Sequence, residues 1–587
     1  MVLCGNTQPA RTRTPTLAPI PSRFVLGLVA LDLRTSRAMK TFTIRTSTFF
    51  LAAAMLIGAR NTEAATIYVN AKASGSALQD GTSWKTAFAS LQDALDKAAG
   101  TTEPDEIWVA EGTYLPTKIY APNRIVGGAS GLQTSHLKTF DLPDRVAIYG
   151  GFAGEEKSRS HRSFRSHRTV LSGGGVSWHV VTAGNDVAHT GVRATLNGLT
   201  IRDGNAQGPG GDLLFAPFSY GHNLGGGLYV AFDSAIEVAN VTFEDNAARG
   251  DGGGLFSINS TLTVAASRFS HNTAGFRAGA AEVFNTYETT AHTARISRTV
   301  FEDNTSRVLG GAIVGEGTFP NERSSMDIAD STFERNTAAV EGGAIVFDSL
   351  TTTVRHSRFE SNVATVTAGA VATTNIVDTI ANASFFGPRH VFIKFATTIS
   401  NCEFRNNVAR GDQAAHDAFS GGAAAGVNFP LGGGALVAYM NGYLNVVESS
   451  FRENLAENGD GGAILNGRSE AHNIFATGAD AFDVRTTIVD SAFVGNQAPR
   501  GNGGAIASLP GAIFSIPART VANTTLSVTS STLEENAAGG NGGAIYLDAS
   551  TATIKANEYE QNRAALGDSI YGVGSLINGS SISPFIR

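Results

Sequence analysis

The sequence predicts an all-β fold, a right-handed parallel β-helix with a capping helix at its N-terminal end. Two short elements, Phe-x-x-Asn and Gly-Gly-Ala-Ile, recur in pairs along the chain. The smallest spacing between successive aromatic positions, 26 residues as from Phe243 to Phe269, occurs three times. The residues between the elements favour Val, Ile and Thr over helix formers. A 26-residue unit of short β segments separated by Gly and Asn fits one coil of such a solenoid.

Composition restricts the class of protein. Of 587 residues, 67 are Gly and 17 are Pro, and charged residues make up only 16%, below the roughly 25% of an ordinary domain. Hydrophobic residues, at 42%, suffice for a core. The net charge of −7 shows no basic excess, which argues against nucleic acid as a partner. Two cysteines, Cys4 and Cys402, exclude a disulfide framework and a thiolate zinc site.

The N-terminal segment is typical of a secretory signal. A basic stretch follows Met39, an apolar run extends from Thr46 to Ala59, and small residues lie at the expected cleavage point near Ala64 or Ala65. The run is too short to span a bilayer of roughly 30 Å. We therefore predict an exported mature chain without a transmembrane segment.

The chain divides into four predicted segments. Residues 1–38 are an upstream mis-start or a genuine extension, 39–65 the signal peptide, 66–200 the N-terminal cap and first coils, and 201–587 the β-helix repeats with loop insertions. If the signal is removed, Cys402 is the remaining thiol.

The cap is predicted from residues 66–200. Ile67–Val69 is a short strand, and an amphipathic helix follows from Trp84 to Ala98, with Gly100 as its stop. This helix is placed to cover the open end of the first coil. Strands of the first coils are expected at Glu106–Val109, Arg145–Tyr149 and Leu196–Ile201, and the basic stretch Lys157–Arg168 is expected to be a solvated loop.

Each element of the repeat has a predicted structural role. Phe at one coil position forms an inward aromatic stack, because equivalent positions repeat every ~4.8 Å. Asn three residues later lies where the strand turns, since Asn tolerates left-handed backbone angles and its amides can form a ladder between coils. The glycine pair permits a sharp corner with positive φ. About ten such coils would extend on the order of 50 Å. The aromatic positions are Phe243, Phe269, Phe301, Phe333, Phe359, Phe404, Phe451 and Phe493, with Leu533 and Tyr559 as degenerate copies.

The paired elements resemble the repeats of the polymorphic outer membrane proteins, best known from chlamydiae. The entry segment resembles the start of bacterial pectin-lyase-like β-helix proteins, through Ile67-Tyr-Val-Asn, Asp80-Gly-Thr-Ser-Trp, Ile107-Trp-Val-Ala-Glu-Gly-Thr-Tyr and Ile148-Tyr-Gly-Gly-Phe. The resemblance implies surface exposure and adhesion. Members of that family end in a membrane β-barrel, for which the residues after Ile570 are too few. We therefore expect no membrane insertion through this segment.

No catalytic, cofactor-binding or metal-ligating residue is predicted. The 12 histidines show no ligand spacing, and the Gly-rich strings lack the Lys-Ser/Thr of a phosphate loop. Two alternatives remain. The acidic pairs Glu244/Asp245 and Glu302/Asp303 recur between Phe and Asn and could bind calcium. The Arg-Gly-Asp triplets Arg249–Asp251 and Arg410–Asp412 could be adhesive, although all three residue types are common in turns.

An enzymatic alternative rests on Arg389, His390 and Lys394. A polysaccharide lyase needs a Lys or Arg base and a cation that neutralises the substrate carboxylate, and these three residues offer both within one insertion. A solvated loop flank is the simpler interpretation. No aspartate trio of a glycoside hydrolase is evident in the sequence.

Insertion lengths predict one decorated flank. Five of the six long repeats place their extra residues between the Ile-type position and the next Phe, whereas the repeat starting at Phe404 places them earlier. Insertions at one coil position must project from one side, which we expect to face the ligand. The predicted ranges are 284–300, 314–332, 372–403, 465–492 and 507–532.

Together these features predict a secreted or surface-exposed protein, exported through a signal peptide to the outer membrane surface or beyond. Its predicted function is adhesin-like binding of carbohydrate or another cell-surface ligand, as a monomer and without a cofactor. The alternative is a polysaccharide lyase or another carbohydrate-active enzyme of the pectin-lyase-like fold, because one fold hosts both functions.

Overall fold

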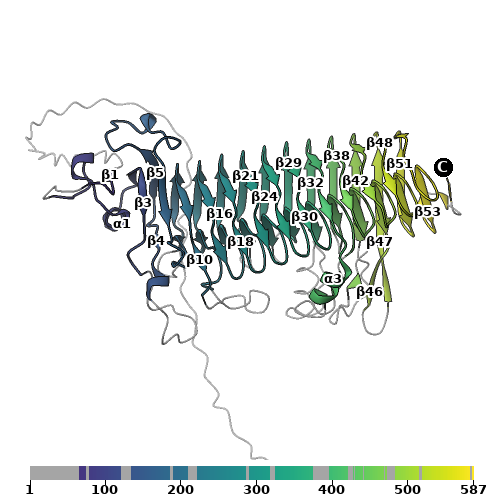
Figure 1. Ribbon diagram of the computed structural model, residues 1–587, viewed down its shortest axis with the longest axis horizontal. Coiled ribbons are helices and arrows are strands. Elements are labelled where there is room, and N and C mark those ends of the chain that lie inside the picture. Colours follow the sequence, from purple (N-terminus) through teal and green to yellow (C-terminus); the bar gives the residue numbers. More distant parts are fainter. Residues whose placement is uncertain are drawn as a thin grey trace, which may run out of the picture. The chain divides into compact units, whose positions relative to one another are not determined.

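The computed structural model confirms a right-handed parallel β-helix, built from stacked coils whose strands pair in parallel with those of the neighbouring coils (Figure 1). The structure describes residues 65–73, 78–119, 134–184, 190–208, 221–285, 290–317, 324–374, 395–420, 427–428, 430, 431–439, 442–467, 470–471, 483–514, 519–578, 580–581 and 585–586. The predicted extension 1–38, with Cys4, and all of the predicted signal peptide except Ala65 lie outside these residues.

Each regular coil contributes one strand to each of four sheets. The coil order is sheet A, sheet B, sheet E and sheet D, and parallel pairing continues sheet by sheet from coil to coil. Sheet A holds β1 (Ala65–Val69), β2 (Asp105–Ala110), β5 (Val146–Phe152), β8 (Arg193–Asn197), β12 (Ala235–Ala239), β16 (Thr261–Ala265), β20 (Thr293–Ser297), β24 (Ser325–Ala329), β28 (Thr351–Arg355), β32 (Ala396–Ser400), β37 (Tyr443–Val447), β42 (Asp483–Val489), β47 (Arg519–Thr529), β51 (Thr551–Lys555) and β54 (Leu576–Ile577).

Sheets B and E are made of shorter strands. Sheet B holds β3 (Gly112–Tyr114), β6 (Thr169–Ser172), β9 (Thr200–Arg202), β13 (Thr242–Glu244), β17 (Arg268–Ser270), β21 (Val300–Glu302), β25 (Thr332–Glu334), β29 (Arg358–Glu360), β33 (Glu403–Arg405), β38 (Ser450–Arg452), β43 (Ala492–Val494), β48 (Thr532–Glu534) and β52 (Glu558–Glu560). Sheet E holds β10 (Asn205–Ala206), β14 (Ala247–Ala248), β18 (Thr273–Ala274), β22 (Thr305–Ser306), β26 (Thr337–Ala338), β30 (Val363–Ala364), β34 (Val408–Ala409), β39 (Leu455–Ala456), β44 (Gln497–Ala498) and β49 (Ala537–Ala538).

Sheet D completes each coil and is followed by the insertions. It holds β4 (Phe140–Asp141), β7 (Val181–Ala183), β11 (Leu228–Val230), β15 (Leu255–Ile258), β19 (Ala281–Asn285), β23 (Ile313–Gly317), β27 (Ile345–Asp348), β31 (Val371–Thr374), β36 (Leu436–Ala438), β40 (Ile464–Gly467), β45 (Ile506–Leu509), β50 (Ile545–Asp548) and β53 (Ile570–Val573). The chain ends with β55 (Ser580–Ser581) and β56 (Phe585–Ile586), which pair antiparallel with β54 and β53.

The predicted aromatic stack lies in the core. The rings from Phe243 to Phe493 stack on one another at centroid distances of 4.5 to 4.9 Å with nearly parallel planes. All of them are fully buried, and Leu533 and Tyr559 continue the column in register. The aliphatic residues of sheets A and D pack against this stack in one continuous core.

The predicted asparagine ladder is confirmed, but the left-handed residue is not the Asn. Asn336 Nδ2 donates to Asn362 Oδ1 at 3.0 Å and to the carbonyl of Phe301 at 2.9 Å, and the pattern repeats in every coil from Asn246 to Asn562. The positive φ falls on the residue before each Asn, for example Arg335 at 53°. The turn therefore uses the preceding residue for its backbone angle, which frees the Asn to point inward.

The glycine corners behave as predicted. The first glycine has positive φ, as at Gly342 with 64°. The second glycine allows neighbouring coils to approach closely, because a Cβ on Gly343 would lie 2.1 Å from the carbonyl oxygen of Gly369 in the next coil.

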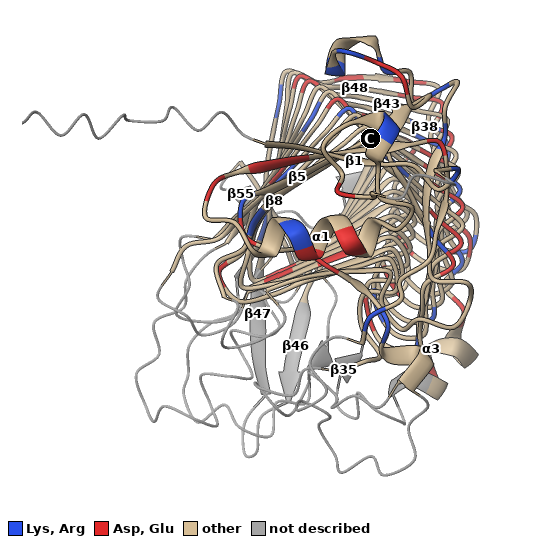
Figure 2. Cartoon of the chain, turned by 90° about the vertical axis from the view of Figure 1, so that its left-hand side faces the viewer, with Lys and Arg blue, Asp and Glu red and all other residues tan. Residues whose placement is uncertain are grey.

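The N-terminal helix is shorter than predicted. A 3-10 turn, η1 (Trp84–Thr86), precedes the helix α1 (Leu91–Ala99), and the Ser90 hydroxyl caps α1 by accepting from Gln92 N. The apolar spacing from Trp84 onward is thus shared by two elements, because the Ser90 cap starts a new helix. Figure 2 shows α1 across the N-terminal end of the coils, as predicted, and its buried residues join the core.

One further prediction for the first coils needs correction. Leu196–Ile201 is not one strand: β8 and β9 belong to different sheets, and Gly198, with φ of 72°, forms the bend between them. The basic stretch Lys157–Arg168 is a largely exposed loop, as predicted; it contains the 3-10 turn η3 (Arg159–His161), and its Arg162 is half-buried. Its guanidinium donates to the carbonyl of Gly150 at 2.8 Å and to Asn197 Oδ1 at 2.6 Å, which holds the loop against sheet A.

The five predicted insertions all leave the coil at one position, between the end of a sheet D strand and the next sheet A strand. The predicted ranges are too wide, because each also contains the following sheet A strand. A 3-10 turn, η2 (Thr134–Leu137), lies ahead of β4, and the helix α3 (Gln413–Ser420) lies between sheets E and D in the coil of Phe404. Short strands β35 (Val427–Asn428), β41 (Glu470–Ala471) and β46 (Gly511–Phe514) pair with one another and with β47 in a side sheet. None of the described helices is long and apolar enough to cross a membrane.

Candidate functional site

The outer face of sheet D is buried and mostly apolar. The second residue of its strands points away from the core and forms a separate apolar cluster. In register along this face lie Phe256, Glu282, Val314, Val346, Ala372, Val437, Leu465 and Ala507. Glu282 is the one acidic residue among these eight, and an acidic side chain on a buried apolar face needs a polar partner.

Glu282 belongs to a buried charged cluster around Arg277. Arg277 Nη2 lies 3.0 Å from Glu282 Oε1 and 3.4 Å from Asp251 Oδ2, and Nη1 pairs with Glu316. The four side chains are at most 8% exposed. Three successive coils supply them, because Asp251 and Arg277 occupy equivalent corner positions and Glu282 and Glu316 lie on β19 and β23.

The cluster holds three carboxyl groups against one guanidinium, so it cannot remain fully ionised. Burial raises the pKa of Glu282 well above its usual value, despite the attraction of Arg277, and burial also raises the pKa of Glu316. Neither oxygen of Glu282, nor Nε of Arg277, has a hydrogen-bond partner among the described residues. The arrangement therefore places carboxyl groups whose pKa is raised by burial beside a guanidinium, and perturbed acids of this kind recur where acid–base chemistry takes place.

A second buried acid lies further along the same face. Tyr439 donates from its hydroxyl to Glu341 Oε2 at 2.7 Å, and Glu341 is 1% exposed. Burial raises the pKa of Glu341 to about 8, although the hydrogen bond from Tyr439 opposes the shift. The outer face of sheet D thus carries two buried glutamates, Glu282 and Glu341, whose pKa is raised by burial.

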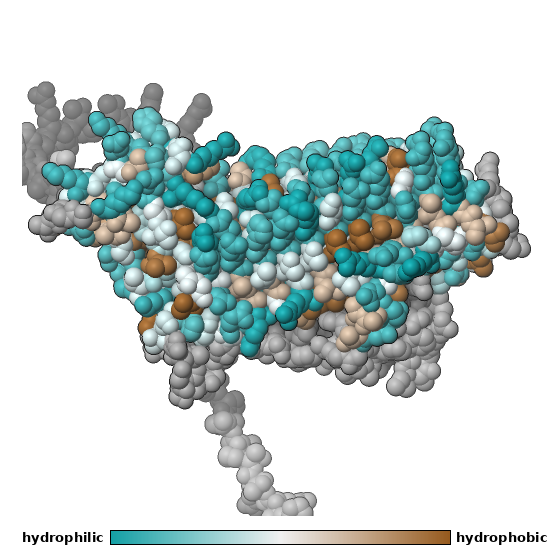
Figure 3. Space-filling model, viewed as in Figure 1, coloured by the Kyte–Doolittle hydropathy of each residue, from teal (hydrophilic) through white to brown (hydrophobic). Residues whose placement is uncertain are grey.

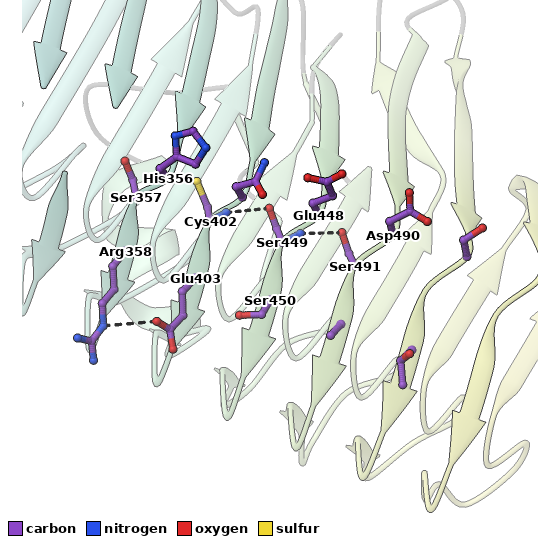
Figure 4. Close-up of a pocket in the computed structure, with 14 residues that line it drawn as sticks. His356, Ser357, Arg358, Cys402, Glu403, Glu448, Ser449, Ser450, Asp490 and Ser491 are labelled. Atoms are coloured by element: carbon purple, nitrogen blue, oxygen red, sulfur yellow. Dashed lines mark hydrogen bonds and ion pairs between the residues drawn. The ribbon is translucent and has the colours of Figure 1, made fainter. Parts of the chain in front are cut away.

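An open groove of about 780 Å³ follows the corner between sheets A and B (Figure 4). It crosses five coils, and its rim carries the polar side chains of His356, Arg358, Glu403, Glu448 and Asp490. Glu448 and Asp490 form no ion pair with any other residue that the structure describes, and both are exposed. Hydrophilic side chains also cover the neighbouring surface over β21, β29 and β38 (Figure 3).

The floor of the groove is a second hydrogen-bonded ladder. Ser449 Oγ accepts from Cys402 N at 3.2 Å and donates to the carbonyl of Val447 at 2.9 Å, and Ser491 Oγ accepts from Ser449 N at 3.2 Å. Cys402 interrupts the serines, and burial raises the pKa of its thiol to about 11. Because the hydroxyls are occupied within the chain, the floor is rigid and the rim provides the free polar groups.

The predicted acidic pairs do not converge on a cation. Glu244 pairs with Arg168 at 2.6 Å, and Asp303 pairs with Arg335 at 2.9 Å. Among the residues that the structure describes, no three or more His, Cys, Asp or Glu side chains are grouped as metal ligands.

The aspartate of each Arg-Gly-Asp triplet has a structural contact. Asp251 is buried and belongs to the Arg277 cluster, and Asp412 Oδ1 accepts from Ala414 N at 2.9 Å and from Ala415 N at 3.0 Å, which caps α3. Arg389, His390 and Lys394 lie outside the described residues.

The sequence analysis missed Arg277, Glu282, Glu316 and Glu341. Among these four, Glu282 departs from its coil position, because its column is otherwise apolar from Phe256 to Ala507. Arg277 and Glu341 share the position before the corner with Asp251, Thr367 and Asp460, and Glu316 lies in register with Asp348, so these positions carry polar residues in several coils. An alignment of the repeats by coil position, rather than a search for known motifs, would have identified Glu282.

Comparison with known proteins supports the repeat assignment. Two segments, 330–348 and 530–548, match the family of the Chlamydia polymorphic membrane protein (Chlamydia_PMP) repeat. Each contains one Phe-x-x-Asn or Leu-x-x-Asn element and the following Gly-Gly-Ala-Ile element, so the chain carries this repeat, as the resemblance implied. No curated protein matches the sequence.

Several solved structures share the fold at low similarity. PfbA, a surface adhesin of Streptococcus pneumoniae, is 11% identical over 89% of this chain and 96% of its own, with a TM-score of 0.32. The tailspike protein of E. coli bacteriophage HK620 is 11% identical over 82% and 76%, with a TM-score of 0.34. The A-module of Azotobacter vinelandii mannuronan C-5 epimerase AlgE6 is 10% identical over 84% and 94%, with a TM-score of 0.28. Similarity at this level carries no argument about activity.

Proposed function

We propose that this protein is exported to a cell surface, where it binds a carbohydrate chain along the groove between sheets A and B. The main observation behind this proposal is the shape of the groove. It is open, polar and continuous over five coils, and at about 4.8 Å between neighbouring coils its length is roughly 20 Å. An extended polymer suits such a shape, because each coil offers the same position to successive units of the ligand.

The chemistry of the rim supports a sugar ligand. Carboxylates accept hydrogen bonds from hydroxyl groups, and Glu448 and Asp490 form no ion pair within the described part of the chain. The ladder below them keeps the backbone of neighbouring coils at fixed spacing, so little ordering is needed on binding. Export through the predicted signal 39–65 and a location at the outer surface, consistent with the name of the matching repeat family, complete the proposal.

Binding is tested with residues 66–587 on an array of neutral, acidic and amino-sugar oligosaccharides. We expect retention of at least one class, and at least a tenfold loss of affinity when Glu448→Ala and Asp490→Ala are combined. The matched control is Glu558→Ala with Glu560→Ala, which removes two carboxylates from sheet B outside the groove. Equal losses in both double variants, or no retention of any glycan, would reject the groove as the binding site.

A carbohydrate-active enzyme is the second candidate, and the Arg277 cluster favours it. Glycosidases use one carboxylic acid as the proton donor and a carboxylate as base or nucleophile. Glu282, whose pKa is raised by burial, is the candidate donor to a glycosidic oxygen, and Asp251 and Glu316 are the carboxyl groups beside it. The burial of all four side chains favours binding over catalysis as the leading proposal.

The two candidates are separated by following new reducing ends and unsaturated uronate absorbance in parallel with binding. Release of product that disappears in Glu282→Gln but persists in Glu341→Gln would establish the enzyme. Binding without release would leave the groove as the functional site.

A further inference from the structure

The charged side chains of the groove between sheets A and B are unevenly distributed along it. Among the lining residues Arg358 is basic, whereas Glu403, Glu448 and Asp490 are acidic. Arg358 lies at the N-terminal end of the groove, and Glu448 and Asp490 lie beyond Glu403 toward the C-terminal end (Figure 4). The charge that a ligand meets therefore depends on which of these side chains already have a partner within the chain.

At the N-terminal end of the groove, the cationic side chain is paired. Arg358 Nη2 lies 2.6 Å from Glu360 Oε2, and its Nε lies 3.8 Å from Glu403 Oε2. His356 Nδ1 lies 3.7 Å from Asp330 Oδ1. This end of the groove therefore offers little uncompensated charge to a ligand.

At the C-terminal end, two carboxylates lie in neighbouring coils without a cation. Glu448 directly follows β37 and Asp490 directly follows β42, and these two strands pair in parallel, so both residues occupy the same coil position. Neighbouring strands lie about 4.8 Å apart, and like charges side by side at this separation repel each other. Neither carboxylate forms an ion pair with any residue that the structure describes. The facing rim carries only the short side chains of Ser450 and Ala492 in these two coils, so both carboxylates remain open to a ligand.

The backbone turn at this position does not require acidic residues. Glu448 and Asp490 adopt positive φ, at 47° and 49°, and Asn401 and Ser530 hold the same position in the coils on either side, at 52° and 51°. Asn adopts the left-handed region more readily than Glu does. Neutral residues therefore form the same turn, and the two carboxylates add a local negative charge to the groove.

We propose that the ligand of the groove is a glycan with protonated amino groups, which pair with Glu448 and Asp490. This inference rests on the proposed function, because it concerns the ligand of the same groove, and it narrows that ligand to one chemical class. An ammonium group beside two carboxylates forms charge-assisted hydrogen bonds and offsets their mutual repulsion. An N-acetylated sugar lacks this charge, and a uronate adds a further negative charge to the site.

The test compares two forms of one ligand on the full chain. A glucosamine oligosaccharide and its fully N-acetylated counterpart of the same length are titrated by calorimetry, at a pH that keeps the free amine protonated. We expect the amino form to bind about tenfold more tightly or more. This preference should shrink as salt is added, because exposed charges are screened.

The two forms also separate failure of this inference from failure of the proposed function. Equal affinity for both forms, or tighter binding of the N-acetylated form or of a uronate oligosaccharide, would overturn the inference and leave the groove as a glycan site. Retention of no glycan at all would reject both. This comparison uses the wild-type chain and does not depend on the folding of a variant.

Substitution locates the charge that sets the preference. Glu448→Gln combined with Asp490→Asn removes both charges and keeps an acceptor oxygen on each side chain. The two forms of the ligand should then bind with affinities within about twofold of each other. The matched control, Glu558→Gln with Glu560→Gln, removes two carboxylates of β52 outside the groove and should keep the wild-type preference. An undiminished preference in the groove variant, or the same loss in the control, would overturn the inference.

A chelator distinguishes direct pairing from binding through a metal ion. The amino form should bind equally well in EDTA, because an ammonium group contacts the carboxylates without a bridging cation. Binding that requires added Ca²⁺ would overturn the inference, since the two carboxylates would then hold the metal ion and not the amine.

Discussion

The inner corners of the coils and the outer face of sheet D follow opposite rules. At the corner between sheets B and E, Asn336 and its equivalents are buried and hydrogen-bonded in the same way in every coil. At the preceding corner, between sheets A and B, the serine ladder repeats its hydrogen bonds from coil to coil. On the outer face of sheet D, neighbouring coils differ, and Arg277, Glu282 and Glu341 leave buried polar atoms without hydrogen-bond partners among the described residues.

This difference separates positions that every coil shares from positions that differ between coils. A ladder that is satisfied in every coil serves the fold by its regularity. Buried polar atoms without hydrogen-bond partners cost stability, and among the described residues the outer face of sheet D carries several of them. The following substitutions test that division, from the largest expected effect to the smallest.

Asn336→Ala should have the largest effect on stability. It removes the acceptor of Asn304 N and the donor to the carbonyl of Phe301, at 3.1 and 2.9 Å. Leaving these two buried groups unsatisfied costs about 2–6 kcal/mol in total. Urea denaturation followed by circular dichroism measures the loss. Asn445→Ala on the outer face of sheet A is the control and should lose far less; similar losses would mean that the ladder does not stabilise the coil stack.

Arg277→Met should also destabilise the protein, by about 3–5 kcal/mol, because it leaves buried carboxyl groups without their cation. Glu282→Gln should change the free energy of unfolding little, since burial raises the pKa of Glu282 and so favours its neutral form, which Gln resembles. The contrast between the two variants, measured by the same denaturation, tests the protonation state. A large loss in Glu282→Gln would show that Glu282 is an ionised partner of Arg277.

Glu341 should make stability depend on pH. The folded protein keeps the proton of Glu341 up to a pKa of about 8, whereas the unfolded chain releases it near 4.5. The folded state therefore binds more protons in this window, and stability falls as the pH rises from 4.5 to 8, by at most about 1.4 kcal/mol per pH unit. Melting temperatures of Glu341→Gln should show a flatter profile between these values. An unchanged profile would refute the raised pKa.

Cys402→Ser should have the smallest effect, within about 1 kcal/mol in either direction. The thiol donates to the carbonyls of Ser400 and Val354 at 3.3 and 3.6 Å, and a serine there would restore the hydroxyl that neighbouring coils carry. The denaturation midpoint checks this. A loss comparable to that of Asn336→Ala would show that the two ladders are not equivalent.

The sequence predicted those parts of the structure that repeat. The aromatic stack, the corner glycines and the position of the insertions followed from spacing, because a solenoid places equal positions in register. The left-handed residue before Asn336 was missed, since Asp, Arg, Ser and Glu share that position and show no common residue type. The split between β8 and β9 was missed because a single Gly198 breaks an otherwise continuous apolar run.

The candidate sites could not be predicted in the same way. Glu282, Arg277 and Asp251 are separated by coil-length intervals and become neighbours only once the coils are in register. The groove is lined by ordinary turn residues, whose concave arrangement depends on the angle between sheets A and B. The order and spacing of residues along the chain show neither which side chains meet across coils nor where the surface is concave.

The most direct test of the account is hydrogen–deuterium exchange with and without a bound oligosaccharide from the array. Binding along the groove predicts slower exchange in segments 356–358, 401–403, 448–450 and 490–492, with no change around Arg277. Protection confined to residues 251–282 and 313–317 would contradict the account and place the ligand on the outer face of sheet D.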